Sequence, residues 1–161
     1  TNSLATNDVV AAHGAYARYR DGLLQAGVEL HELKANARAL HRQVRLFKGR
    51  SRASLHTKAM VLDRREVFVG SFNIDPRSVH LNTEMGYYVA SQEMGQQVAA
   101  FIEEGLAPEN SYRLSREQGR LTWSGDGENG KPEVLHNEPR VGLWRRLAAF
   151  LLALLPIENL L

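Results

Sequence analysis

Two side chains that can act on a phosphoryl group lie two residues apart in a β-rich segment. His56 and Lys58 occur within Leu-His-Thr-Lys-Ala-Met-Val-Leu-Asp, residues 55–63. Successive residues of a strand point to opposite faces, so these two are expected on one face. An imidazole beside an ammonium is unfavourable unless an anion lies between them. A phosphate would satisfy both, with Lys58 on a non-bridging oxygen and His56 at the phosphorus or the leaving oxygen.

Further residues that suit the same anion follow in residues 70–78. If this segment is extended, Ser71 and Asn73 share a face, and both can donate to phosphate oxygens without adding charge. Gly70 has no side chain, which lets the backbone approach closely. The turn that Pro76 fixes would present Arg77, whose guanidinium can bind phosphate through two hydrogen bonds.

Two carboxylates complete the set of candidate residues. Glu84 opens the next predicted strand and could accept a histidine Nδ1–H bond, fix the tautomer and stabilise an imidazolium. Asp63 closes the strand before Arg64 and Arg65. It could take part in the chemistry or simply support the turn, and the residues alone leave both interpretations open.

The elements that must position these residues follow from hydrophobic spacing and turn signals. Residues 55–70 are predicted to form a hairpin, and residues 83–90 a strand. The order of elements predicts an α/β fold, a mixed β-sheet layered with helices on its faces. The other expected elements are helices over 6–27, 91–107 and 141–155, and strands near 28–33, 111–115, 120–124 and 133–136.

Composition is that of one globular domain, and its charge is uneven. The chain has 161 residues, of which 43% are apolar and 24% charged. It has no cysteine, and its six histidines show no ligand spacing, so no disulfide, metal or other cofactor is predicted. Residues 34–65 contain ten lysine or arginine residues and one acid, a cationic stretch that attracts phosphates, nucleic acid or acidic lipid.

Taken together, the motifs resemble the HKD signature of the phospholipase D superfamily. The signature here is His56-x-Lys58-x4-Asp63, then Gly70-Ser71-x-Asn73, then Glu84. Residues 72–84, with Asn-Ile-Asp-Pro-Arg-Ser, resemble bacterial cardiolipin synthases, especially the branch called cardiolipin synthase C. The similarity extends over most of the chain. The resemblance implies that residues 1–161 are the C-terminal catalytic half-domain of such an enzyme.

The resemblance also implies a mechanism that needs a second motif. One HKD histidine of the family attacks phosphorus and forms a phosphohistidine, while the other serves as acid and base, the role implied for His56. This chain has one motif. The first motif is expected upstream in a longer polypeptide, favoured by the absence of an initial methionine, or in a second copy of a homodimer. A monomeric fragment is expected to be inactive.

The implied function is phosphatidyl transfer that forms cardiolipin, with a phosphatidylglycerol-like substrate. The alternatives are hydrolysis by a phospholipase D, a homodimeric nuclease using the basic stretch, and a domain that only binds phosphate. The basic stretch lacks the interleaved aromatic residues of a nucleic-acid platform, so nucleic acid is not the expected partner. The donor and acceptor headgroups are not predicted.

The C-terminal segment, residues 141–161, has two interpretations. Its helix could dock on its own domain. It could instead lie at a membrane surface, with Trp144, Arg145 and Arg146 at headgroup level and the leucines toward acyl chains. With the implied lipid substrate, the second interpretation predicts a bacterial protein peripheral on the inner membrane, on a side that the sequence does not specify.

Overall fold

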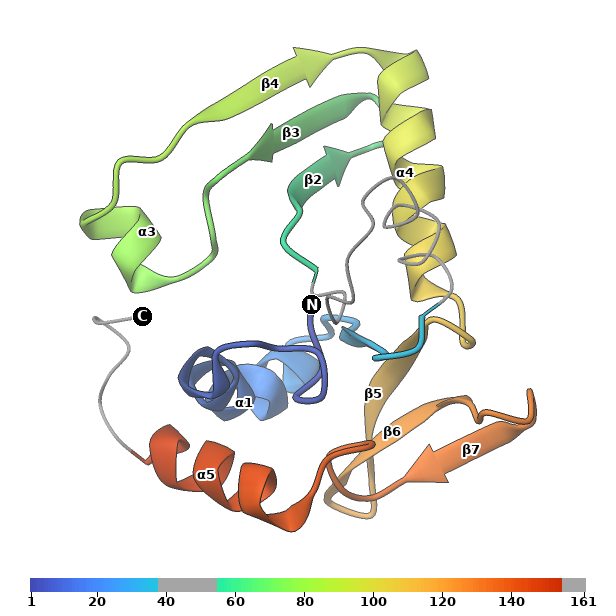
Figure 1. Ribbon diagram of the computed structural model, residues 1–161. Helices are drawn as coiled ribbons and strands as arrows, with labels where there is room; N and C mark the ends of the chain where they lie inside the picture. Colours follow the sequence, from blue (N-terminus) through green and yellow to red (C-terminus); the bar gives the residue numbers. More distant parts are fainter. Residues whose placement is uncertain (38–54, 155–161) are drawn as a thin grey trace, which may run out of the picture. The chain divides into compact units, whose positions relative to one another are not determined.

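The computed structural model describes residues 1–37 and 55–154 (Figure 1). These residues divide into two compact units. The first unit contains residues 1–37, 55 and 105–154, and the second contains residues 56–104. All seven residues predicted for the reaction site, from His56 to Glu84, therefore belong to the second unit.

The first unit combines a four-stranded antiparallel sheet with two helices. Its strands are ordered β1-β5-β6-β7, and an isolated parallel bridge joins Asn2 to Leu33. Tyr112, Leu114 and Trp123 form its buried apolar cluster. The elements of this unit are α1 (Val10–Gln25), β1 (His31–Leu33), β5 (Ser111–Glu117), β6 (Arg120–Asp126), β7 (Pro132–Leu135) and α5 (Leu143–Ala153).

A buried ionic network ties α1 to β1 and to the segment before α5. The guanidinium of Arg20 lies 2.7 Å from Glu32 Oε1 and 2.6 Å from Glu138 Oε1. Trp123 Nε1 donates to Glu32 Oε2 at 2.9 Å. Burial raises the pKa of Glu32, and the charge of Arg20 opposes that shift. Losing one member of such a network leaves the other charge buried and uncompensated.

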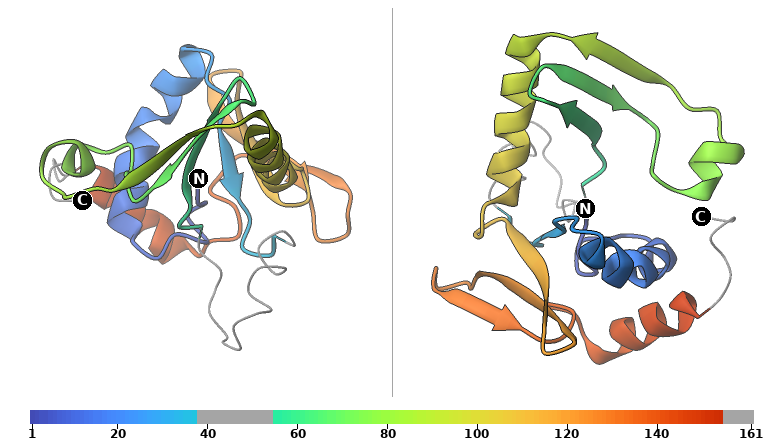
Figure 2. Two further views of the ribbon diagram at one scale, coloured as in Figure 1. Left: turned by 90° about the horizontal axis from the view of Figure 1, so that it is seen from above. Right: turned by 180° about the vertical axis from the view of Figure 1, so that it is seen from behind.

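Helices α1 and α5 lie side by side at very close range, as Figure 1 and the rear view of Figure 2 show. A Cβ built on Gly14 would lie 2.9 Å from the carbonyl oxygen of Ala149 and 3.2 Å from the backbone nitrogen of Ala153. Only glycine fits at this position without displacing α5. The contact face of α5 is therefore its small-residue face.

The second unit is a three-stranded antiparallel sheet with two helices. β2 (Lys58–Leu62) and β3 (Glu66–Gly70) form the predicted hairpin, and β4 (Gly86–Ala90) pairs with β3. A five-residue helix, α3 (Pro76–His80), follows β3. Helix α4 (Gln92–Leu106) follows β4, and the Ser91 hydroxyl accepts its Met94 N–H at 3.2 Å, a capping interaction.

The β2–β3 turn contains two residues in the left-handed backbone region, and helix α4 packs on it. Asp63 and Arg64 adopt left-handed backbone conformations, with φ of 49° and 54°. Aspartate tolerates this region better than most residues. Helix α4 packs directly on the turn, because a Cβ on Gly95 would lie 2.4 Å from the Arg64 carbonyl oxygen. The turn is thus part of the packing of α4.

The structure confirms the predicted α/β class and refines its sheet arrangement. The described strands form two antiparallel sheets of four and three strands rather than one mixed sheet. The expected helices over 6–27, 91–107 and 141–155 correspond to α1, α4 and α5. Most of the basic stretch over residues 34–65 lies outside the described residues.

Replacing Gly95 by alanine should destabilise the protein even though alanine is the better helix former. The new methyl group would collide with the Arg64 carbonyl, at a cost of about 1–3 kcal/mol. Gly105→Ala is the matched control in the same helix. Its Cβ meets nothing within 4 Å, so it should stabilise by up to about 1 kcal/mol. Urea unfolding of both variants measures the difference, and equal effects would contradict the packing of α4 on the turn.

Candidate active site

The register of the second unit's sheet brings three distant parts of the chain to one end. Lys58 lies opposite Gly70, and Gly70 lies opposite Gly86. His56 stands two residues before Lys58, and Glu84 stands two residues before Gly86. This is the end of the sheet at which β3 leads toward α3 (Figure 1). Antiparallel pairing therefore gathers four of the seven predicted site residues, His56, Lys58, Ser71 and Glu84.

Lys58 and His56 are joined through the backbone. Lys58 is half-buried, and its Nζ donates to the carbonyl oxygen of His56 at 3.0 Å. His56 itself is exposed, and its imidazole has no hydrogen-bond partner among the described residues. The Lys58 ammonium thus contacts the backbone of His56, and the His56 residue remains exposed.

Ser71 and Glu84 form the tightest contact of this site. The Ser71 hydroxyl donates to Glu84 Oε2 at 2.5 Å and accepts the Met85 N–H at 3.0 Å. Its single proton is therefore directed at a carboxylate, and not at the open side where a phosphate would bind. β3 also ends at Gly70, so the extended path that would place Ser71 and Asn73 on one face is not formed. In this geometry Ser71 positions Glu84.

A chain of hydrogen bonds continues from Glu84 to Arg77. Asn82 Nδ2 donates to Glu84 Oε1 at 3.1 Å, and Arg77 Nε donates to Asn82 Oδ1 at 3.0 Å. Hydrogen bonds from Ser71, Asn82 and Ser78, followed by the charge of Lys58, lower the pKa of Glu84. The carboxylate is therefore ionised at neutral pH, within electrostatic range of Lys58.

The short helix α3 fixes the loop that carries Asn73 and Arg77. Asp75 caps it by accepting the Ser78 N–H at 2.7 Å, and Pro76 occupies its first turn. The buried Ser78 hydroxyl accepts the Asn73 N–H at 3.4 Å. Asn73 itself is exposed.

Residues 1–105 match the protein-family model described as "Cardiolipin synthase, PLD-like domain". The chain belongs to this phospholipase D-like family. The family resemblance read from His56, Lys58, Ser71, Asn73 and Glu84 is thereby confirmed.

Named relatives of the chain are bacterial proteins. The chain is 44% identical over its full length to cardiolipin synthase C of Escherichia coli (strain K12), of which it covers 34%. It is 31% identical to an uncharacterized protein of Helicobacter pylori (strain J99), over 91% of this chain and 28% of that protein. It is 26% identical to cardiolipin synthase A of Pectobacterium carotovorum, over 73% of this chain and 21% of that protein. No solved structure matches the chain significantly.

The chain spans about a third or less of the length of these relatives. The family, described as a cardiolipin synthase domain, is one of phospholipid biosynthesis. None of the helices within residues 1–37 and 55–154 is long and apolar enough to cross a membrane.

Asp63, the last residue of the family motif, lies apart from the other members of the site. It stands in the turn at the opposite end of β2 from Lys58, beyond a strand that extends roughly 3.3 Å per residue. Its neighbour Arg64 forms an ion pair with Glu103 of α4. This position fits the second interpretation of Asp63, support of the turn.

Two polar residues of the site, Asn82 and Ser78, were not singled out from sequence, and neither was Asn2 of the first unit. Asn82 and Ser78 belong to the hydrogen-bond chain around Glu84 and Asn73. In the first unit, the Asn2 side chain bonds both the N–H and the carbonyl of Leu55, each at 2.8 Å. Asn82 lies two residues before Glu84, a spacing that could have indicated its role.

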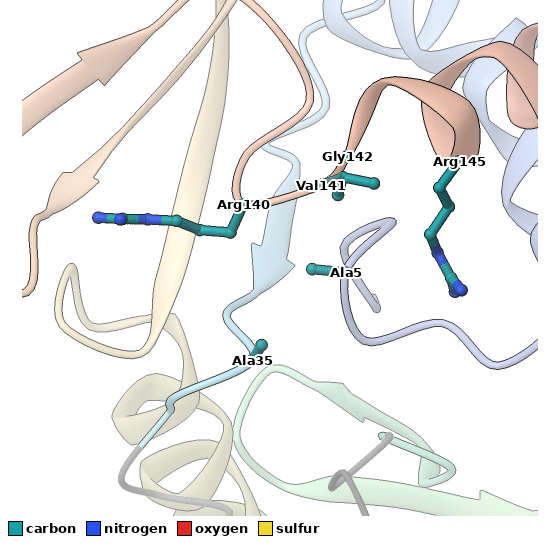
Figure 3. A pocket seen from close by; sticks show the side chains of 6 residues that line it. All are labelled: Ala5, Ala35, Arg140, Val141, Gly142 and Arg145. Carbon is teal, nitrogen blue, oxygen red and sulfur yellow. The ribbon is translucent and has the colours of Figure 1, made fainter.

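A shallow pocket of the first unit contains none of the predicted site residues. Arg140, Arg145 and four small or apolar residues line it (Figure 3). Arg145 Nε donates to the carbonyl of Leu4 at 3.1 Å, and Arg140 lies 3.3 Å from Glu128. Because both guanidinium groups already have partners, this pocket does not replace the strand end as candidate site.

Replacing Ser71 by alanine should raise the pKa of Glu84 toward the ordinary value of about 4.3. The hydroxyl supplies the largest of the interactions that favour the carboxylate. The depressed pKa of Glu84 contributes to folding stability at pH values above the unfolded-state pKa. That contribution is lost as the pH falls through the lower folded-state pKa. Carboxyl-carbon NMR titration measures the shift, with Ser115→Ala in β5 as the control. An unchanged Glu84 titration in Ser71→Ala would show that the Ser71 hydroxyl does not lower the pKa of Glu84.

Proposed function

We propose that this chain supplies one phosphate-binding half-site of an enzyme that transfers a phosphatidyl group between phospholipids to form cardiolipin. The observation that carries the proposal is the meeting of Lys58, His56 and Glu84 at one end of a sheet. The identity to cardiolipin synthase C supports the same substrate class. A cation, a proton carrier and an ionised carboxylate are the groups that phosphoryl transfer needs.

In the proposed reaction, a histidine of a second half-site attacks the phosphorus of the donor lipid. His56 gives its proton to the leaving alcohol oxygen as the P–O bond breaks and the P–N bond forms. It then removes the proton of the acceptor hydroxyl of phosphatidylglycerol, which attacks phosphorus and releases the first histidine. Acid–base catalysis of this kind contributes about 10²–10⁴ in rate.

The remaining residues stabilise charge in this scheme. Lys58 and Arg77 neutralise the phosphorane oxygens, and the Asn73 carboxamide donates to one of them. Glu84, held ionised by Ser71 and Asn82, stabilises an imidazolium that forms at the site. We assign Asp63 to the β2–β3 turn rather than to the chemistry. No metal or other cofactor enters the scheme.

The second half-site comes from polypeptide outside residues 1–161 or from a second copy of this chain. The first arrangement is favoured because relatives such as cardiolipin synthase C are about three times as long as the matched region. The substrate implies work at a membrane surface, and we propose a peripheral association with the bacterial inner membrane.

A second candidate function is hydrolysis of phospholipid, with water as the acceptor. It is favoured by one observation, the exposure of the His56 ring. A nuclease that uses the basic residues 34–65 is the third outcome. Incubating the protein with phosphatidylglycerol, and separately with DNA, distinguishes cardiolipin, phosphatidic acid and cleaved DNA as products.

His56→Asn in the complete polypeptide should reduce cardiolipin formation by about 10²-fold or more, because it removes the acid and base. Thin-layer chromatography of labelled phosphatidylglycerol measures the product. His136→Asn is the matched control, since His136 is exposed and lies in the first unit. Circular dichroism should show both variants folded. Near-normal turnover by a folded His56→Asn would rule out the assigned role.

Residues 1–161, expressed alone and monomeric, should form no cardiolipin, because half of the phosphate-binding groups are missing. Light scattering establishes the mass of the assayed species. Activity from a proven monomer would overturn the half-site proposal, and activity found only in a dimer would assign the second half-site to another copy.

A further inference from the structure

Helix α5 and its C-cap residue expose six large apolar side chains. Their spacing, i, i+1, i+4, i+7, i+8 and i+11, places them on one face of the helix. Their exposed fractions run from 43% for Leu147 to 82% for Trp144. The residues of this outer face are Leu143, Trp144, Leu147, Phe150, Leu151 and Leu154.

This arrangement reverses the usual amphipathic pattern, in which large apolar residues turn inward. Where α5 meets α1, the small residues Ala149 and Ala153 lie against Gly14. The helix is therefore held to its unit by close backbone contact. The six exposed apolar side chains therefore remain available for contact with a surface outside this unit.

The two arginines of α5 fix this orientation. Arg145 donates to the carbonyl oxygens of Leu4 and Asn7, and Arg146 donates to that of Glu138 at 2.7 Å. Both guanidinium groups thus point toward the unit, and not to the level of lipid headgroups as the membrane interpretation of the sequence expected. Any rotation that buried the outer face would break these bonds.

The charge and composition of the helix fit a lipid surface. From Leu143 to Ala153, α5 carries two arginines and no carboxylate, so it contains nothing that repels anionic headgroups. Trp144 joins an apolar ring to a polar N–H, the combination enriched at membrane interfaces. α5 also lies outside residues 1–105, the part shared with the family domain.

We propose that the outer face of α5 inserts into the surface of a phospholipid bilayer. The face runs along the whole helix, so the helix axis lies parallel to the membrane and the six side chains enter the acyl boundary together. This inference rests on the proposed lipid substrate, because a bilayer is where such a substrate resides. It adds a membrane-binding element separate from the reaction site.

The test is binding of the complete polypeptide to sucrose-loaded vesicles of phosphatidylethanolamine and phosphatidylglycerol, measured by sedimentation. Phe150→Ser/Leu151→Ser should weaken binding by about tenfold or more, because it removes two inserted side chains. Val28→Ser/Val134→Ser is the matched control. These valines are also partly exposed in the first unit, and their replacement should leave binding unchanged.

Fluorescence locates the helix directly. Emission from Trp144 should shift to shorter wavelength when vesicles are added and should be quenched by brominated acyl chains. Trp144→Phe identifies the signal, because Trp123 is buried. A Trp144 signal that does not respond to vesicles would overturn the proposal.

Two further measurements separate this inference from the proposed function. His56→Asn should bind vesicles like the unmodified protein, whereas Phe150→Ser/Leu151→Ser should retain transfer on detergent-dispersed lipid. If neither the unmodified protein nor any variant transfers phosphatidyl groups, while vesicle binding is intact, the proposed function alone is rejected. Unchanged vesicle binding by Phe150→Ser/Leu151→Ser would reject the membrane role, and a fall in oligomer mass instead would assign the outer face to a second copy.

Discussion

The pairing of Lys58 with Gly70 and of Gly70 with Gly86 is the constraint on which the site depends. A strand has a two-residue period, so a slip of one residue would turn Lys58 to the other face and separate Ser71 from Glu84. The close approach predicted for Gly70 is present, since a Cβ there would lie 2.4 Å from the Met85 carbonyl oxygen. Strand register and chemistry are therefore coupled.

The residues around this pairing have two roles. Some are placed to contact a substrate, and others hold those residues in position. Ser71 and Asn82 occupy both oxygens of Glu84, and Asp75 and Ser78 order the loop of Asn73. His56 and Asn73 are exposed, and their side chains lie outside this set of hydrogen bonds. A hydrogen-bonded frame of this kind limits the movement of charged groups when a phosphate arrives.

Local patterns predicted the hairpin because it depends on residues close in sequence. The same reasoning expected Ser71 to face a phosphate, since it assumed an extended chain where the structure bends. Short-range rules did not reveal the five-residue α3, although Asp75-Pro76 is a good helix start. The contacts of Arg20 with Glu138 and of Arg145 with Leu4 join residues more than a hundred positions apart, and no local spacing signals them.

The buried Arg20–Glu32–Glu138 network affects how genetic experiments on this protein should be interpreted. A charge left alone in that environment shifts the balance toward the unfolded chain, which cellular proteases remove. Substitutions there would lower the amount of protein in the cell while leaving each surviving molecule competent. A mutant strain carrying one of them would therefore report on protein turnover, and raising expression would restore its phenotype.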